Sequence, residues 1–291
     1  MLIAVVNSEE KSSGEKSKDN QKKEGSIKEN EADFERNLLN STMGYQKIQL
    51  ISLKTRYDRR SIMKILADCL NIKVDVLDAS NPYVDKHAIK VANTTSLANN
   101  TGMSMGTLGC WKSHRKVWSD AVKNKRATTL ILEDDIDVVK DFKKINARAL
   151  KDLHTQKIDW DMFYIGHCLG DEKKKPAIFK GSIVHRSNYP ACTHSYAVSL
   201  KGAKKLLEFT KDFTNPIDLQ ILGLIGSRKV NSYSINTTTT RQSFYGGDTS
   251  IGTNPNAQNN GDEKKNSMLH KCIDNTFMRK NYFLAEKSKL N

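Results

Sequence analysis

The sequence predicts an α/β protein built on an open, mostly parallel β-sheet with helices on both faces. Three observations support this prediction. From residue 46 onward, short strand-like runs alternate with helix-like stretches, which is the order typical of parallel sheets. Several of these runs are apolar throughout, as expected of strands that are buried on both faces. With 291 residues, the chain is long enough to bury a core without disulfides or metals.

The first expected elements lie between residues 46 and 105. The apolar run QKIQLISL at 46–53 predicts a strand, and the apolar residues of 58–70 recur three and four apart, as in an amphipathic helix. Residues 72–78 alternate apolar and polar side chains, so we expect a second strand there. The polar stretch 79–105 predicts a long loop with one short helix.

The later elements follow the same alternation. Residues 106–125 predict a helix with one face of small and apolar residues. The short apolar run ATTLIL predicts a buried strand that leads directly into acidic residues. In order, the expected elements are a strand at 127–132, a helix at 139–152, strands at 161–166 and 194–200, and helices at 201–210 and 216–226.

The two ends differ in composition from the middle. Residues 1–39 alternate Lys with Glu and contain few large apolar side chains, so we expect a disordered, charged tail. Residues 246–291 begin with a Gly- and Asn-rich stretch and are expected to form a loop-rich C-terminal segment. The remaining residues, 40–245, are expected to form one folded domain.

The net charge of +14 comes from the expected domain, because residues 1–40 contain more acidic than basic side chains. A basic domain favours anionic partners such as phosphate-bearing substrates, acidic glycans, membranes or nucleic acids. The sequence contains no RNP-type aromatic motif, no zinc-finger spacing and no helix-turn-helix signal. We therefore expect no nucleic-acid partner.

The cysteines and the chain start leave the compartment open. There are five cysteines without metal-site spacing; Cys69 and Cys110 fall in apolar helical patterns and are expected to be small buried hydrophobes. The opening MLIAVV is too short for a signal-peptide core or a membrane span. We expect no transmembrane segment in this chain, and either a secretory lumen or the cytosol as its location.

The most informative motif is the acidic run TTLILEDDID at 128–137. An apolar strand ends there in Glu133, Asp134 and Asp135, with Asp137 two residues further on. In open α/β sheets, ligands bind at the carboxyl ends of strands. Crowded carboxylates repel one another unless a cation or several donors compensate them, and oxygen ligands of this kind suit a hard divalent ion that also contacts phosphates. The alternative is that the acids cap the next helix.

Six segments in register resemble glycosyltransferase family 25. They are ISLKTRYDRR (51–60), GTLGCWKSHRKVW (106–118), LILEDDID (130–137), WDMFYIGHC (160–168), HSYAVSLKGAKKLLE (194–208) and NPIDLQI (215–221). Together they span about residues 40–240, in the family's order. The family includes bacterial lipooligosaccharide galactosyltransferases and the enzymes that galactosylate collagen hydroxylysine, and the wording of NSTMGYQKIQLISL and WDMFYIGHC looks closest to the fungal branch.

The resemblance implies a GT-A type fold, with the nucleotide-sugar site at the strand carboxyl ends. It also implies metal-dependent, inverting transfer of a sugar, with galactose expected, from a uridine-diphosphate donor to a glycan or protein hydroxyl. The cofactor would be Mn²⁺ or another divalent cation held by Glu133 and Asp135, and Asp218 in the P-I-D segment would be the catalytic base. The nucleotide-sugar would contact Leu53, Arg56, Arg59, Ser113, His114, Asp134 and His194.

Several of these residues have a structural alternative. Arg59 or Arg60 could be a solvated arginine at a helix start, and His114 could be a hydrogen-bonded core histidine. His194 could simply begin a strand, and Asp218 could be a carboxylate that favours a helix N-terminus. For the chain as a whole, the alternative is a family member that has lost catalysis and acts as a binding or scaffold protein. A nucleotidyltransferase is disfavoured because SLKTRYDRR (52–60) is not a Gly-rich phosphate loop.

Overall fold

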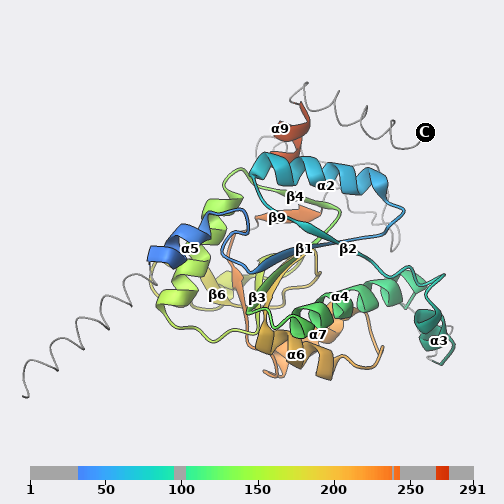
Figure 1. The fold of residues 1–291 in the computed structure, drawn as a ribbon. Helices are drawn as coiled ribbons and strands as arrows, with labels where there is room; N and C mark the ends of the chain where they lie inside the picture. Colours follow the sequence, from blue (N-terminus) through green and yellow to red (C-terminus); the bar gives the residue numbers. More distant parts are fainter. Residues whose placement is uncertain (1–31, 95–102, 238, 243–266, 275–291) are drawn as a thin grey trace, which may run out of the picture.

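A computed structural model describes residues 32–94, 103–237, 239–242 and 267–274. Its centre is a seven-stranded sheet with the strand order β2-β1-β3-β7-β5-β8-β6 (Figure 1). The strands are β1 (Lys47–Ser52), β2 (Asp75–Asp78), β3 (Thr128–Glu133), β5 (Met162–Gly166), β6 (Val184–Arg186), β7 (Ser195–Ser199) and β8 (Ser232–Ile235).

The sheet is mostly parallel, as predicted. The strand pairs β1–β2, β1–β3 and β5–β8 are parallel, whereas β7 pairs antiparallel with both β3 and β5. On one side of β7, the strands β2, β1 and β3 therefore run in the same direction as β5 and β8 on the other side. At the edge of the sheet, β6 runs antiparallel to β8. As a result, the start of β7 lies at the same edge as the carboxyl ends of β3 and β5, where the backbone N–H of Glu133 donates to the carbonyl of His194 over 3.0 Å.

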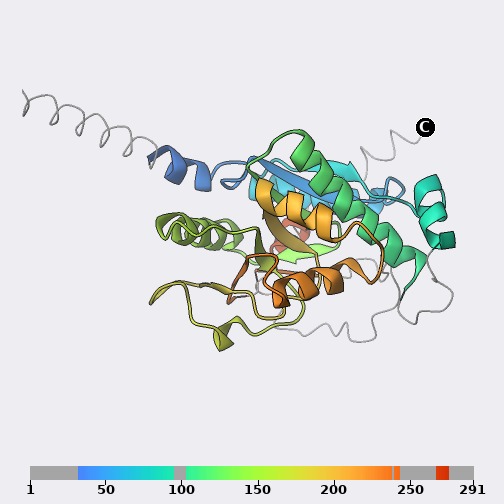
Figure 2. The same ribbon diagram turned by 90° about the horizontal axis from the view of Figure 1, so that it is seen from below.

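Helices cover both faces of the sheet, as Figures 1 and 2 show. One core contains Leu130, Leu132 and Phe163 and packs under α2 (Tyr57–Leu70), α5 (Phe142–Thr155) and α9 (Met268–Asp274). The other core contains Ile131 and Tyr164 and packs under α3 (Lys86–Thr94), α4 (Met105–Lys123), α6 (Leu200–Phe209) and α7 (Ile217–Gly226). Alternate residues of one strand enter different cores, because successive side chains point to opposite faces.

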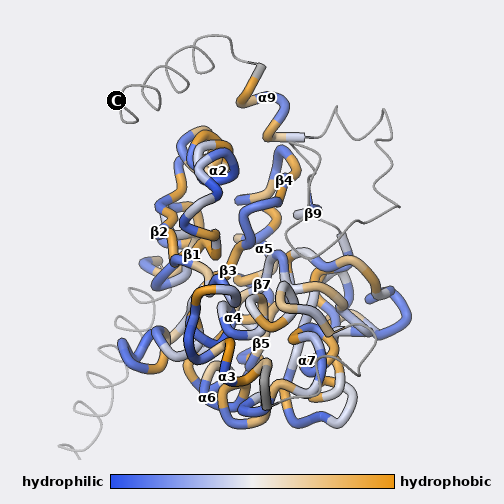
Figure 3. Tube along the Cα trace, turned by 90° about the vertical axis from the view of Figure 1, so that its right-hand side faces the viewer, coloured by the Kyte–Doolittle hydropathy of each residue, from blue (hydrophilic) through white to orange (hydrophobic). Residues whose placement is uncertain are grey.

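The helices follow the expected apolar periodicity. In Figure 3, hydrophobic and hydrophilic residues alternate along α2, and its buried residues include Met63, Ile65 and Leu66. In α4, the side chain of Ser104 caps the helix by accepting from the backbone N–H of Thr107, which satisfies one of the free N–H groups of the first turn.

The structure adds short elements that the sequence did not predict. After the acidic turn, β4 (Ile136–Val138) pairs antiparallel with β9 (Thr240–Gln242) in a second, two-stranded sheet. The helix expected from residue 139 therefore begins only at Phe142. A short 3₁₀ helix, η2 (Glu172–Lys174), lies in the connection between β5 and β6. β6 and β8 extend the sheet beyond β5.

Helical structure extends past both ends of the domain that was expected at 40–245. Residues 32–38 form a helix inside the segment expected to be a tail, where Phe34 stacks on His154 and Leu38 is buried. α9 lies within the segment expected to be loop-rich. Residues 1–31 and 246–266 lie outside the described residues, as do 275–291.

The expectation that Cys69 is a small buried hydrophobe is wrong. Cys69 lies on the exposed side of α2 and forms a disulfide with Cys272 of α9, across a sequence separation of 203 residues. A second disulfide joins Cys168 to Cys192. Periodicity could not show this, because a partner so distant in sequence leaves no local pattern. Cys110 is the free cysteine of the chain and is partly buried.

Candidate active site

The acidic run forms a tight turn between β3 and β4 and does not cap a helix. Glu133 ends β3, and Asp134 and Asp135 form the turn. The next helix, α5, begins at Phe142 after Asp141. The alternative reading, in which these acids stabilise a helix N-terminus, is therefore wrong. The turn lies at the carboxyl edge of β3, where the sheet topology places ligands.

One arginine compensates two of these acids. Arg59 of α2 is 6% exposed, and its Nη1 lies 2.9 Å from Asp134 Oδ1 and 3.4 Å from Asp135 Oδ2. Asp134 Oδ2 also accepts a hydrogen bond from Ser52 Oγ over 2.6 Å. Arg59 is therefore a buried partner of the turn and not a solvated helix-start arginine. Its guanidinium orients both carboxylates.

Asp135 has the least compensation of the three acids. Its Oδ1 atom is buried without a hydrogen-bond partner. Burial, followed by the nearby charge of Glu133, raises the pKa of Asp135 to about 7. A buried carboxylate oxygen without a donor is unfavourable by itself, and a divalent cation would compensate it. The surroundings of Asp135 therefore fit the divalent ion expected from the acidic run of the sequence.

Glu133 is held by a network that the sequence did not predict. Its Oε1 accepts from Thr193 Oγ1 over 2.7 Å and from His114 Nε2 over 3.1 Å. Although burial alone would raise the pKa of Glu133, these hydrogen bonds and the charge of His114 keep it below its ordinary value. Both bonds fall on Oε1, so the carboxylate is oriented with its other oxygen left for a ligand.

The network continues behind His114 into the core. Because an ionised carboxylate only accepts, Nε2 of His114 carries the hydrogen toward Glu133. Nδ1 of His114 lies 2.9 Å from the hydroxyl of Tyr196, and this hydroxyl accepts from Trp118 Nε1 over 3.0 Å. His114 is 1% exposed. It is thus a hydrogen-bonded core histidine that positions Glu133, the alternative considered from the sequence.

The remaining residues expected to bind the donor lie in two places. Leu53 and Arg56 follow β1 at the same edge, and Arg56 pairs with Asp58 over 2.8 Å. Ser113 is buried; its hydroxyl donates to the carbonyl of Gly109 over 2.6 Å and accepts from the backbone N–H of Ser80 over 2.9 Å. These bonds tie α4 to the loop after β2. A contact between Ser113 and the donor stays a prediction.

His194 lies at the start of β7, next to the acidic turn. The ring is 1% exposed, and its Nε2 lies 3.4 Å from the carbonyl oxygen of Thr240. Burial lowers the pKa of His194. Gly166 is needed beside it, because a Cβ at that position would lie 1.5 Å from Thr240 Oγ1 and 2.9 Å from His194 Nε2.

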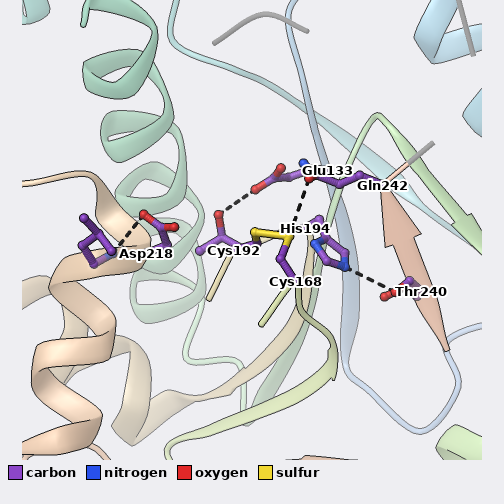
Figure 4. The surroundings of a disulfide bond; sticks show 9 residues. Glu133, Cys168, Cys192, His194, Asp218, Thr240 and Gln242 are labelled. Atoms are coloured by element: carbon purple, nitrogen blue, oxygen red, sulfur yellow. Dashed lines mark hydrogen bonds between the residues drawn. A yellow bond between two sulfur atoms is a disulfide. The ribbon is translucent and has the colours of Figure 1, made fainter. Parts of the chain in front are cut away.

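Asp218 lies in the first turn of α7 and is partly exposed. Figure 4 draws it on the opposite side of the Cys168–Cys192 disulfide from His194. Burial raises the pKa of the Cys110 thiol, and the charges of Glu133 and Asp218 raise it further, so both carboxylates lie within electrostatic range of this thiol. The structure therefore brings Asp218 into the neighbourhood of Glu133, although 85 residues separate the two in sequence.

Two side-chain clusters among the described residues have ligand atoms within 4.8 Å of one another. One contains Cys110, His114 and Glu133, and the other contains Cys168, Cys192 and His194. Asp135 belongs to neither. Asp137 is not part of the site: it is 3% exposed, and its Oδ1 accepts the backbone N–H groups of Val138 and Leu269, which fixes α9.

Comparison with known proteins extends this description. Residues 45–221 match the model of glycosyltransferase family 25 (LPS biosynthesis protein). Procollagen galactosyltransferase 1-A of Xenopus laevis is 32% identical over 174 residues, and procollagen galactosyltransferase 2 of Homo sapiens is 28% identical over 173 residues. The inactive glycosyltransferase 25 family member 3 of Homo sapiens is 29% identical over 176 residues.

These matches cover part of each protein. Each spans 57% of this chain but only 28–29% of the relative's length. A solved structure, a glycosyltransferase involved in glycosylation of the major capsid of PBCV-1, matches over 70% of this chain and 95% of its own, with 11% identity and a TM-score of 0.34. The proposed likeness to fungal members stays a prediction. No described helix is long and apolar enough to cross a membrane.

Proposed function

Since the chain belongs to glycosyltransferase family 25, we propose that it is an inverting, metal-dependent transferase that moves a sugar from a nucleotide donor to a hydroxyl group. The observation that carries this proposal is the acidic turn at the carboxyl edge of β3, with the unpartnered Oδ1 of Asp135. We propose a uridine-diphosphate sugar as donor and galactose as the sugar, in keeping with the galactosyltransferase relatives. The acceptor would be a glycan or protein hydroxyl.

The proposed metal ligands are Glu133 and Asp135. Mn²⁺ or another divalent cation, when bound, would stabilise negative charge that develops on the diphosphate leaving group. His114 and Thr193 orient Glu133 through Oε1. Arg59 holds Asp134 and Asp135 in place. These contacts fix the carboxylates before any ligand binds, which lowers the cost of organising the site.

Asp218 is the proposed base. It would accept the proton of the acceptor hydroxyl as that oxygen attacks the anomeric carbon from the face opposite the diphosphate. Inversion needs only one base and no covalent intermediate. Asp218 fits this role in that it lies on a different element from the acidic turn, in the first turn of α7, and is partly exposed. An acceptor could therefore reach it.

A panel of labelled nucleotide sugars with Mn²⁺ tests the activity, with donor hydrolysis and transfer as readouts. We expect hydrolysis of a uridine-diphosphate sugar by the wild-type protein. Removal of a general base typically costs ~10²–10⁴ in rate, so Asp218→Asn should lose transfer by about that factor while retaining nucleotide binding. Near-normal transfer by Asp218→Asn would contradict the assignment and leave Asp218 as a helix-start carboxylate.

A second candidate function is binding without catalysis. It is favoured by the similarity to relatives described as inactive members of the family. The same panel separates the two: a protein that binds the nucleotide with Mn²⁺ but neither hydrolyses nor transfers any sugar would be such a member. A loss of nucleotide binding in Asp218→Asn would instead place Asp218 among the donor contacts. The base would then be sought elsewhere, with Asp171 and Asp248 as candidates; Asp248 lies outside the described residues.

A further inference from the structure

The disulfide between Cys168 and Cys192 lies beside a buried histidine nitrogen that has no partner. Figure 4 draws this bond beside His194 and close to Glu133. The Nδ1 atom of His194 is buried and makes no hydrogen bond. One sulfur from each cysteine and one nitrogen of His194 lie within 4.8 Å of one another. Nothing in the proposed transfer reaction uses this arrangement.

We propose that reduction of this disulfide creates a soft metal site, in which the thiolates of Cys168 and Cys192 and Nδ1 of His194 bind Zn²⁺. Two sulfurs and one imidazole are a ligand set that selects zinc over Mn²⁺. Three protein ligands leave a fourth position open for water or another ligand. The oxidised protein lacks the site, because neither sulfur is then a thiolate.

The imidazole is already in the form that a metal needs. Nε2 faces the carbonyl oxygen of Thr240 at 3.4 Å, and a carbonyl only accepts, so Nε2 carries the hydrogen. Nδ1 therefore has a free lone pair. Ligating histidines commonly donate their other N–H to a backbone carbonyl, which fixes the tautomer and the orientation of the ring. His194 has this partner without any metal present.

The two cysteines would stay close after the bond breaks. The backbone N–H of Cys168 donates to the carbonyl of Ala191 over 3.0 Å, and the neighbouring strands β5 and β7 remain paired at Gly166 and Ser195. Two sulfurs on one tetrahedral zinc lie about 3.8 Å apart, given zinc–sulfur bonds of about 2.3 Å. Cys168 is exposed, so its loop can make this small adjustment.

The chemistry balances with a dithiol as the reductant. The dithiol gives two electrons and two protons to the Cys168–Cys192 bond and is itself oxidised to a disulfide. Zinc binding then displaces the two thiol protons. Exposure of Cys168 gives a reductant access to the bond. The segment that would bind zinc includes Thr193, which hydrogen-bonds Glu133, so the site adjoins the proposed donor site.

Anaerobic titration of the full chain with Co²⁺, a spectroscopic substitute for Zn²⁺, tests the proposal. The protein is reduced and the reductant is removed before the titration. We expect thiolate-to-cobalt charge-transfer and tetrahedral ligand-field bands that saturate at about one equivalent and disappear when Zn²⁺ is added. Oxidised protein should give none of these bands. Mn²⁺ should not displace the cobalt.

Two variants distinguish this site from other thiols. His194→Ala should weaken cobalt binding by at least roughly 10–100-fold, the amount that even an outer-shell partner contributes. Cys168→Ser/Cys192→Ser should abolish the bands, and Cys69→Ser/Cys272→Ser should leave them intact, because no His, Asp or Glu completes a metal cluster with that pair among the described residues. If His194→Ala fails to fold, the comparison between the two double Cys→Ser variants tests the proposal by itself.

Absence of the bands in reduced wild-type protein, or their persistence in Cys168→Ser/Cys192→Ser, would overturn the proposal. Unchanged cobalt affinity in folded His194→Ala would do the same. These readouts are independent of sugar transfer. An inactive protein with the bands would count against the proposed function only, and an active protein without them would count against the zinc site only.

Discussion

Asp161 and Asp135 are both buried carboxylates at strand ends, but they lie at opposite edges of the sheet and have different surroundings. Asp161 directly precedes β5, is fully buried, and has Lys205 at 2.6 Å, Lys201 at 3.4 Å and the backbone N–H of Asn231 at 2.8 Å. Asp135 follows β3 and shares Arg59 with Asp134. Each acid has a buried Oδ1 without a hydrogen bond. Asp161 faces two lysines, however, whereas Asp135 shares one arginine and lies near the charge of Glu133. Asp135 is therefore the acid whose charge a bound cation can compensate.

The largest expected effect on stability is that of Asp161→Asn. Removing this charge weakens the hydrogen bonds that Asp161 accepts from Lys205 and from the backbone N–H of Asn231, and a hydrogen bond to a charged group typically contributes about 1.5–3 kcal/mol. Denaturant unfolding should show this loss. Uridine diphosphate binding should be unchanged at temperatures where the variant is folded, because Asp161 lies at the edge opposite the proposed site. A loss of less than about 1 kcal/mol in unfolding free energy would contradict the claim that Asp161 stabilises the fold.

The second prediction concerns how protein stability depends on pH through Asp135. The pKa of Asp135 is raised to about 7 in the folded, metal-free protein, so the folded state binds its proton more tightly than the unfolded chain does. Its contribution to stability is therefore fully present near pH 4 and is lost as pH rises toward 7. Between pH 4 and pH 7, the unfolding free energy of the wild type should fall by about 2–4 kcal/mol more than that of Asp135→Asn. One pKa unit corresponds to about 1.4 kcal/mol.

Unfolding curves of both proteins in chelator at several pH values measure this difference. Parallel pH profiles for wild type and Asp135→Asn would mean that Asp135 is as well compensated as Asp161. The variant isolates one carboxylate, since all other titrating groups are common to the two proteins.

A smaller effect is expected at Gly202, which packs on the backbone of Asp161. A Cβ at this position would lie 2.0 Å from the carbonyl oxygen of Asp161, so Gly202→Ala must shift α6 away from the start of β5. We expect a loss of about 1–3 kcal/mol in the unfolding free energy, as for other overpacked sites. Gly223, where a Cβ would meet nothing within 4 Å, provides the matched control: Gly223→Ala should be neutral or stabilising.

The sequence predicted the parts of the fold that depend on local patterns. The apolar runs at 46–53 and 127–132 became β1 and β3, and the amphipathic stretch 58–70 became α2. It did not predict that β7 would run antiparallel between β3 and β5, because strand pairing is set by contacts far apart in sequence. The short strands β4 and β9 were missed because three-residue strands show little periodicity.

The sequence likewise predicted only the part of the site that has a local pattern. The acids Glu133 and Asp135 could be found because crowded carboxylates after an apolar strand are unusual. The network of Thr193, Tyr196 and His114 could not, because hydroxyl and indole groups carry no sequence signal until the fold brings them together. The hydroxyl of a tyrosine in a buried strand needs a hydrogen-bond partner. The tyrosine in the strand expected at 194–200, Tyr196, therefore indicated that some polar group lies next to it.

Calorimetry of uridine diphosphate binding tests the central claim most directly. The account predicts that wild-type protein binds the nucleotide with Mn²⁺ and loses most of this affinity in chelator, because Asp135 and Glu133 hold the ion that contacts the phosphates. Asp135→Asn should lose the Mn²⁺-dependent part of the affinity, roughly 10–100-fold or more, while Asp161→Asn retains it. Equal affinity with Mn²⁺ and with chelator, or wild-type affinity in Asp135→Asn, would contradict the account.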